Sequence, residues 1–338
     1  MKRIAIIVLA VLLLVGCEPQ KQRYSAVNID CFDTVTQIIA YTKTESDFKE
    51  LETLVFSELK RYHKLFDAYN DYEGVNNIKT LNENAATEPV KVDPELFELI
   101  EFGYEYYDRT FGRCNIFLGA VLQEWHGCRE DSLSRGETSI PDMAILKEKG
   151  EFALNKNVVL DKENLTVFFS TDAVQLDVGA IAKGFVADKI AELVRSKGYD
   201  SVAISLGGNV ITVGKRADGS EWSIGIQDPQ DPDGTVLSTK LVDTSLVTSG
   251  DYQRYYYHDG KKYHHIIDPE TLMPAEFFSS VSVVCDSSAV ADALSTALFC
   301  LPLDDGHAIA TEMGAEVLWI TPDGKQYSTT GFEEVIKR

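Results

Sequence analysis

Basic side chains are scarce in this chain of 338 residues. The 32 lysines and arginines stand against 53 aspartates and glutamates, which gives a formal net charge of −21. A surface this acidic repels phosphate backbones and argues against a nucleic-acid-binding protein. It also means that an anionic nucleotide ligand would need a metal ion or a local positive site. The remaining composition, 44% hydrophobic and 25% charged, is typical of a globular protein with a sizeable core.

Paired cysteine motifs are also missing. The chain has six cysteines, none in C-x-x-C spacing: Cys17, Cys31, Cys114, Cys128, Cys285 and Cys300. Lipidation of the first, argued below, would leave an odd number. We therefore predict neither a zinc site nor a disulfide framework.

The N-terminal segment is typical of a secretory signal. In "MKRIAIIVLAVLLLVGCEPQ", two basic residues precede an apolar run that is short for a membrane span. The end of the run, "LLVGC", resembles a bacterial lipobox, which implies cleavage before Cys17 and lipidation of its thiol. An uncleaved anchor helix with an incidental cysteine is the alternative. Because each buried CH₂ of an acyl chain contributes about 0.8 kcal/mol, we expect a mature protein anchored on the extracytoplasmic face of the cell membrane.

The chain lacks a Pro/Gly/Ser-rich linker and an internal repeat after its N-terminus. We predict a signal peptide over 1–16, the lipidated cysteine and a tether over 17–27, and one domain over 28–338. Periodicity and turn residues predict helices over 45–69, 93–112 and 177–200, a strand over 31–41, a strand over 201–214 broken by Gly207-Gly208, hairpins over 253–269 and 315–329, and a strand followed by a helix over 280–301. Hairpins mixed with helices indicate an α+β fold with a largely antiparallel sheet flanked by helices.

In "ADALSTALF" (291–299), Asp292 and Thr296 lie one turn apart on the same helix face, among residues that favour burial. The hydroxyl could bond to its own helix and the carboxylate could pair with a basic residue. Alternatively, carboxylate, hydroxyl and backbone carbonyl are hard oxygen donors that suit Mg²⁺, which needs few protein ligands beside substrate phosphates.

Two glycine-containing segments could receive a ligand. In "QLDVGAIAKGF" (175–185), Asp177 and Gly179 precede a helix whose N-terminus could dock phosphate oxygens. An N-cap and ordinary turn glycines explain this segment more simply. In "SLGGNV" (205–210), the glycine pair indicates either close passage of a ligand or a β-bulge.

The segment "YHHIIDP" offers a proton acceptor. Neighbouring residues on a strand face opposite ways, so one of His264 and His265 can point into a cleft while the other faces solvent. A histidine beside an apolar pocket is suited to take a proton from a hydroxyl at neutral pH. Two structural or surface histidines remain the alternative.

In this order, the segments "LDVGAIAKGF", "SLGGNV", "TSGDY…YHHIIDP" and "ADALSTALF" resemble the ApbE family of flavin transferases, as do the earlier "FDTVTQI", "FDAYNDYEGVNNIKTLN" and "GRCNIFLGAVLQEWHG". The resemblance covers nearly everything after the tether. It implies an ApbE-like single domain in which FAD binds with Mg²⁺ and a Ser or Thr hydroxyl of a partner protein attacks the flavin-side phosphate. FMN would become attached to the protein and AMP would leave.

The resemblance also implies residue roles. His265 resembles the proposed general base, and Asp292, Thr296 and the Ala180 carbonyl resemble the metal ligands, with Ser295 beside them. The FAD contacts it implies are Phe32, Tyr69, Asn115, Asp177, Lys183, His265 and Ile266. Many relatives have Asp at the position of Asn115, so this contact loses a charge here.

Two rival functions remain open. Water could replace the protein hydroxyl, which would make the chain an FAD pyrophosphatase that releases FMN and AMP. The chain could also be a non-catalytic lipoprotein that binds a flavin or another solute. The family expectation for the acceptor is an electron-transfer membrane subunit or an extracellular flavoprotein.

Overall fold

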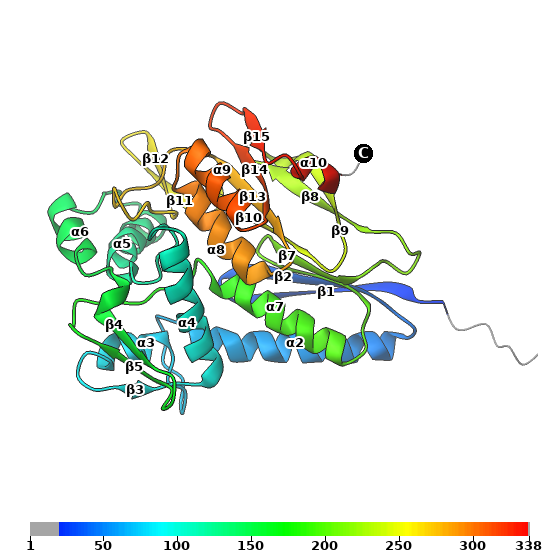
Figure 1. Ribbon diagram of the computed structural model, residues 1–338, viewed down its shortest axis with the longest axis horizontal. Helices are drawn as coiled ribbons and strands as arrows, with labels where there is room; N and C mark the ends of the chain where they lie inside the picture. The colour runs from blue at the N-terminus through cyan, green and yellow to red at the C-terminus, as the bar shows by residue number, and fades with distance from the viewer. Residues whose placement is uncertain (1–19, 337–338) are drawn as a thin grey trace, which may run out of the picture.

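The computed structural model describes residues 20–336, and an antiparallel sheet of eight strands forms its centre (Figure 1). This confirms the predicted α+β class. The strand order is β1-β2-β6-β7-β10-β13-β14-β15. Their bounds are β1 Gln22–Cys31, β2 Thr34–Thr42, β6 Ser201–Leu206, β7 Asn209–Gly214, β10 Ser245–Gly250, β13 Ser280–Cys285, β14 Glu316–Ile320 and β15 Gln326–Ser328.

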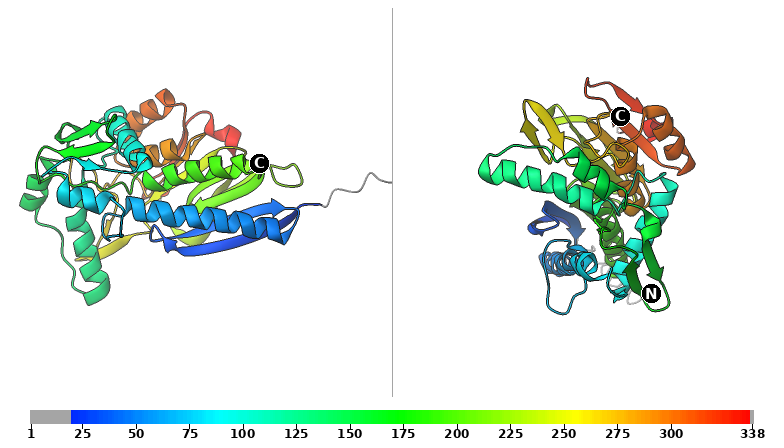
Figure 2. Two further views of the ribbon diagram at one scale, coloured as in Figure 1. Left: turned by 90° about the horizontal axis from the view of Figure 1, so that it is seen from below. Right: turned by 90° about the vertical axis from the view of Figure 1, so that its left-hand side faces the viewer.

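A layer of helices covers one face of this sheet. Its members are α2 Glu45–Phe66, α7 Ala182–Ser196, α8 Ser288–Phe299 and α9 Leu303–Glu312. In α2, Leu51, Val55 and Leu59 recur at helical spacing and are fully buried, opposite Ile38 and Ala40 of β2. Helices α2 and α7 run side by side across the layer (Figure 2). Burial of this apolar face holds the helices that carry the candidate site residues against the sheet.

A long β-ribbon covers part of the other face. It consists of β8 Trp222–Asp228 and β9 Asp231–Leu241, followed near the C-terminus by α10 Phe332–Val335. Trp222, Leu241 and Phe332 pack against Leu246 and Leu318 of the sheet. The sheet is therefore covered on both faces. In β6, for example, the residues from Val202 to Leu206 are buried almost without interruption.

The remaining elements gather at one end of the sheet, at the left in Figure 1. They are α3 Ile78–Asn84, β3 Val90–Lys91, α4 Pro94–Arg109, α5 Gly119–Arg135, α6 Met143–Gly150, the 3₁₀ turn Asn155–Asn157, β4 Val158–Asp161, β5 Thr166–Phe169, β11 Tyr255–His258 and β12 Lys261–His264. Helix α4 confirms the helix predicted over 93–112, and its N-cap is Asp93, which accepts a hydrogen bond from Glu95 N at 2.9 Å and is followed by Pro94.

The segment predicted as one broken strand over 201–214 is a hairpin. Leu206 pairs with Asn209, and Gly207 and Gly208 form the turn with φ of +57° and +97°. A two-residue hairpin turn of type I′ needs positive φ at both positions, which glycine adopts without a steric cost. The hairpin predicted at Asp259-Gly260 is confirmed as β11 and β12.

Residues 22–27, expected to form part of a tether, are instead the first half of β1, which pairs with β2 from Gln22↔Thr42 onward. Tyr24 and Ala26 alternate toward the helix layer, and the Tyr24 ring stacks on Phe48 at 5.4 Å. Two inward apolar residues in a polar segment are a weak signal on their own. The predicted signal peptide and Cys17 lie outside the described residues. No helix within 20–336 is long and apolar enough to cross a membrane.

Candidate active site

Helices α7 and α8 meet at a glycine. A Cβ at Gly184 would lie 2.2 Å from the Ser288 carbonyl oxygen and 2.7 Å from Cβ of Asp292, so any other residue would push the helices apart. Gly184 N donates to Asp292 Oδ2 at 2.8 Å. The close contact thereby places the carboxylate of Asp292, a residue that is only 3% exposed, against the first turn of α7.

The N-terminus of α8 is held by a side chain of α7. Asp188 accepts hydrogen bonds from Ser287 Oγ at 2.7 Å, Ser288 N at 2.8 Å and Ala289 N at 2.9 Å. Burial outweighs these bonds and raises the pKa of Asp188. Ser287 is the N-cap of α8 and accepts from Val290 N at 3.2 Å. Because Asp188 of α7 bonds to the same turn, it fixes where Asp292 and Thr296, further along α8, stand relative to α7.

Helix α7 begins at Ala182, later than the residue 177 predicted from the sequence. Asp177 is not its N-cap. Its Oδ1 instead accepts a hydrogen bond from Gly179 N at 2.8 Å, which forms a local turn before the helix. This turn brings Asp177, Gly179 and Ala180 to the wall of the pocket described below.

A cationic group already lies where the metal site was predicted. Lys183 Nζ lies 3.6 Å from Asp292 Oδ1 and donates to Gly179 O at 3.4 Å. The hydroxyl of Thr296 makes no hydrogen bond to any residue within 20–336, so it is open to a ligand. Ser295 does not line the pocket, because its Oγ bonds to Ser249 Oγ at 2.8 Å and to Asp292 O at 3.0 Å.

The donor set suits a hard cation. Residues 20–336 contain no group of three or more His, Cys, Asp or Glu side chains able to hold a metal ion. A site at Asp292 and Thr296 would therefore depend on hydroxyl, carbonyl, water and substrate oxygens besides one carboxylate. Mg²⁺ tolerates such a set, and softer metals do not.

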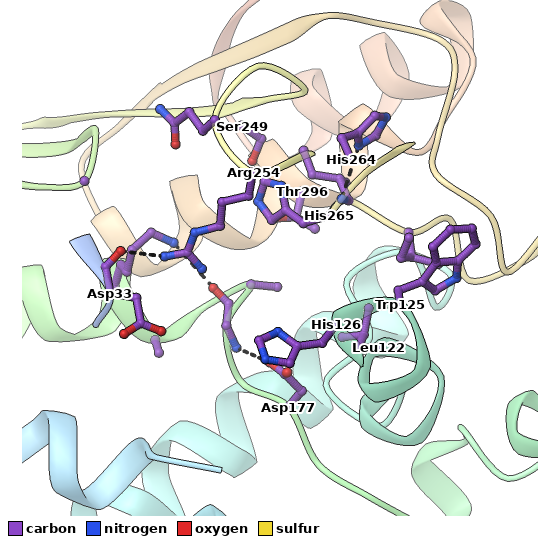
Figure 3. A pocket seen from close by; sticks show the side chains of 18 of the residues that line it. Asp33, Leu122, Trp125, His126, Asp177, Ser249, Arg254, His264, His265 and Thr296 are labelled. Carbon is purple, nitrogen blue, oxygen red and sulfur yellow. Dashed lines mark hydrogen bonds between the residues drawn. The ribbon is translucent and has the colours of Figure 1, made fainter. Parts of the chain in front are cut away.

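One pocket of about 560 Å³ collects the predicted residues (Figure 3). Segments far apart in the chain line it, from the β1–β2 turn to α8. All ten residues that the resemblance assigned to FAD or to the metal are on its walls: Phe32, Tyr69, Asn115, Asp177, Ala180, Lys183, His265, Ile266, Asp292 and Thr296. The structure thus brings them together, and their individual roles remain predictions.

The two adjacent histidines have separate environments. His264 is 7% exposed, and both its ring nitrogens are used: Ile266 N donates to Nδ1 at 3.2 Å, and Nε2 lies 2.8 Å from Ala275 O. It was expected to face solvent, but it packs against Phe299 instead. His265 points into the pocket (Figure 3), and His264 also lies on the pocket wall, so the expectation that only one of the pair faces the cleft was wrong.

His265 is held neutral. The residue is exposed to the cleft, but its ring lies between the pocket walls, and desolvation lowers its pKa from 6.5. The cations Arg254 and Lys183 lower it further. A neutral imidazole that is not tied up by the backbone can accept a proton at physiological pH.

An acidic turn fixes the aromatic wall. Asp67 accepts hydrogen bonds from Tyr69 N at 2.7 Å and from Tyr72 Oη at 2.8 Å, with two more from Asn70. Burial alone would raise the pKa of Asp67, but these bonds lower it. The Tyr69 ring lies 5.1 Å from that of His126. Tyr69 therefore reaches the pocket from a loop with a fixed backbone.

Both polar atoms of the Asn115 side-chain amide make hydrogen bonds to the backbone. Its Oδ1 accepts from Phe117 N at 2.8 Å, and its Nδ2 donates to Ala153 O at 3.0 Å. An aspartate at this position could not make the second bond. The departure from the family pattern therefore matches the local backbone.

Sequence reasoning did not identify the cations Arg113, Arg129 and Arg254 as site residues, although all three line the pocket. Arg129 Nη2 donates to His126 Nδ1 at 2.8 Å, while Arg113 Nη1 pairs with Asp268 Oδ1 at 2.6 Å. Arg129 and Lys183 supply the local positive charge that so acidic a chain needs for a phosphate-bearing ligand, whereas Asp268 and Glu270 balance the charge of Arg113. The only sequence signal was this charge requirement, which does not say which of 32 basic residues meet it.

Together these groups can bind a polyanion, hold a hard cation against it and accept one proton. That combination suits transfer of a phosphate-linked group to a hydroxyl or to water.

A sequence model described as the ApbE family matches residues 32–319. A curated relative from Treponema pallidum, named FAD:protein FMN transferase, is 34% identical over 84% of this chain and 80% of its own. One of the same name from Vibrio cholerae is 27% identical over 97% of both chains. The solved ApbE protein of Thermotoga maritima superposes with a TM-score of 0.84 at 25% identity, over 94% of this chain and all of that one.

Proposed function

This chain belongs to the ApbE family and is an enzyme that transfers FMN from FAD to a target protein, and we propose that it uses Mg²⁺ and a Ser or Thr hydroxyl as acceptor. The observation that supports the proposal is the convergence in one pocket of a neutral histidine, His265, with the oxygen donors Asp292 and Thr296. The chain itself supplies the base and the metal donors that such a transfer needs.

In the proposed reaction, His265 accepts the proton of the acceptor hydroxyl. The hydroxyl oxygen forms a new bond to the flavin-side phosphorus, and the bond from that phosphorus to the bridging oxygen breaks, so AMP leaves with the bridging oxygen. Asp292, Thr296 and the Ala180 carbonyl would hold Mg²⁺, which would neutralise charge on the diphosphate. Lys183 and Arg129 add positive charge around the same oxygens.

The proposal assigns the flavin to the aromatic side of the pocket. Phe32 and Tyr69 offer ring surfaces there, and Ile266 adds an apolar contact. Asp177 and Asn115 offer hydrogen-bonding groups in the same pocket. Burial raises the pKa of Tyr69 to about 12, with a further contribution from Asp177, so its hydroxyl stays neutral beside the ligand.

We also propose that lipidation of Cys17 holds the enzyme on the extracytoplasmic face of the membrane, because the lipobox-like "LLVGC" follows a short apolar run. Its acceptors would then be electron-transfer membrane subunits or extracellular flavoproteins. Mass spectrometry of the membrane fraction tests this: a mature chain starting with an acylated Cys17 is expected, and a Cys17→Ser variant should lose the acyl mass. An unmodified thiol at position 17 would contradict the anchor.

The reaction itself is tested with FAD, Mg²⁺ and a Thr-bearing peptide, with a Thr→Val peptide as the matched control. We expect a mass increase of one FMN on the Thr peptide only, with AMP released in equal amount. Release of FMN and AMP without a peptide adduct would favour the FAD pyrophosphatase. Tight FAD retention with no AMP release would favour the non-catalytic binding protein. Because the peptide is a probe, co-expressed candidate acceptors should be weighed as well.

A further inference from the structure

The turn between β1 and β2 has an unusual composition. Three two-residue hairpin turns in the described part of the chain have positive φ at both positions: Phe32-Asp33, Gly207-Gly208 and Asp259-Gly260. The last two contain glycine. Phe32 and Asp33, at φ +58° and +49°, do not, although a bulky aromatic residue strongly disfavours this conformation. The turn without glycine is the one whose two residues line the pocket.

Side chains from distant segments hold this turn. Phe32 N donates to His63 Nδ1 at 3.3 Å. Arg254 Nη2 donates to the carbonyl oxygens of both turn residues, at 3.4 Å to Phe32 and 2.9 Å to Asp33 (Figure 3). Strained backbone persists only where surrounding contacts fix it. The guanidinium of Arg254 therefore stabilises the conformation that presents the Phe32 ring.

The main chain of Arg254 holds another wall of the pocket. Its carbonyl oxygen accepts a hydrogen bond from His265 N at 3.1 Å, which continues the β11–β12 ladder past the Tyr255↔His264 pair. Arg254 thus joins two walls through one residue: its side chain holds Phe32 and Asp33, and its backbone holds His265.

We propose that Arg254 is a positioning residue that locks the strained Phe32-Asp33 turn in place and so sets the affinity of the pocket for FAD. The inference rests on the proposed function. Locking the turn before the ligand arrives removes an ordering cost from binding.

A direct role for the guanidinium is the competing explanation. If Arg254 acted mainly by its charge on the diphosphate, a lysine would largely replace it. If it acts by holding two carbonyl oxygens with the N–H groups of Nη2, which the planar guanidinium keeps in fixed directions, a lysine would fail almost as badly as a neutral residue. The two explanations therefore differ in how they rank Arg254→Lys and Arg254→Gln.

The first experiment measures FAD affinity by quenching of flavin fluorescence, together with KM and kcat for AMP release. We expect both variants to raise the dissociation constant and the KM about tenfold, as loss of charged hydrogen bonds implies, and to leave kcat within about twofold. Arg216→Gln, which removes an arginine bonded to Tyr41 outside the pocket, is the matched control. Wild-type affinity in Arg254→Lys, or a fall in kcat without a change in KM, would overturn the proposal.

A second-site substitution sharpens the test. Asp33→Gly removes the steric cost of the left-handed conformation, so it should recover most of the lost FAD affinity in the Arg254→Gln background. Asp33→Asn removes the same charge but keeps the strain, and it should recover little. Equal recovery by both, or none by glycine, would refute the positioning role. Because the affinity measurement needs no turnover, a wild-type protein that binds FAD but transfers no FMN would refute the proposed function and leave this test intact.

Discussion

Two walls of the pocket are built in opposite ways. The helix wall, defined here as residues 179–184 with Asp292 and Thr296, is buried at its base, joined by glycine and bears one carboxylate. The loop wall, defined as the Phe32-Asp33 turn with Tyr69, Arg129 and Arg254, is more exposed and comes from segments far apart in the chain. The helix wall depends on close packing of two elements, and the loop wall on individual hydrogen bonds. We therefore expect damage to the first to affect folding and metal binding, and damage to the second to affect ligand affinity.

The largest effect is expected for Asp292→Asn on the helix wall. The amide keeps an acceptor for Gly184 N but loses the charge, so the fold should persist while Mg²⁺ binding is lost. We expect AMP release to fall by about a thousandfold or more, because metal stabilisation is worth several kcal/mol. Calorimetric titration with Mg²⁺ gives an independent readout. Full activity in this variant would refute the metal assignment.

His265→Gln should come next, with a loss of about a hundredfold to ten-thousandfold in kcat if the ring is the general base. The wild-type pH profile adds a signed prediction. Because the pKa of His265 is lowered from 6.5, the neutral ring persists as pH falls below that value. The rate should stay flat between about pH 6 and 8 and decline only at more acidic pH, as the imidazole becomes protonated. A midpoint at or above 6.5 would contradict the environment described here.

Gly184→Ala tests the packing of the helix wall. Its added methyl meets the Ser288 carbonyl and Asp292, so we expect a loss of about 1–3 kcal/mol in the free energy of unfolding. Gly127→Ala in α5 is the matched control, since a Cβ there has no neighbour within 4 Å. That change should stabilise the protein by up to about 1 kcal/mol. Urea denaturation measures both, and equal midpoints would show that the helices can separate at no cost.

The smallest effect is expected for Asn115→Asp, which restores the residue common in relatives. A carboxylate would face Ala153 O in place of a donor, at a cost of about 1–2 kcal/mol to stability. Protonation of the new carboxyl restores the donor, so the stability gap to wild type should narrow as pH falls toward about 4. Thermal unfolding at several pH values checks this. A stability difference between this variant and wild type that widens as the pH falls would mean that the Ala153 contact is unimportant.

The two walls of the pocket also differ in how far the sequence alone could predict their residues. The helix wall comes from two short segments, and residue types and spacing indicated the chemistry of Asp292 and Thr296 in advance, while Lys183 came from the family resemblance. The start of α7 was misplaced because Asp177 caps a local turn instead of the helix. Spacing along a chain cannot distinguish these two uses of an aspartate.

The loop wall was only partly predictable. Phe32 and Tyr69 came from the family resemblance, whereas Arg254 and Arg129 were missed. Their role depends on which carbonyl or ring each guanidinium meets, and those partners lie far away in sequence. Likewise, Gly207-Gly208 indicated an interrupted strand, but only the pairing of Leu206 with Asn209 shows a hairpin.

Strand β1 has a consequence for where the enzyme can work. It starts at Gln22, five positions after Cys17, and runs to Cys31 beside the catalytic pocket. Ten residues of extended chain span about 30 Å. On a lipid-anchored enzyme, this strand would act as a fixed spacer that separates the chemistry from the bilayer surface. Substrate proteins would then have to display their hydroxyl at a matching height, so reach, as well as local sequence, would select which proteins receive the flavin.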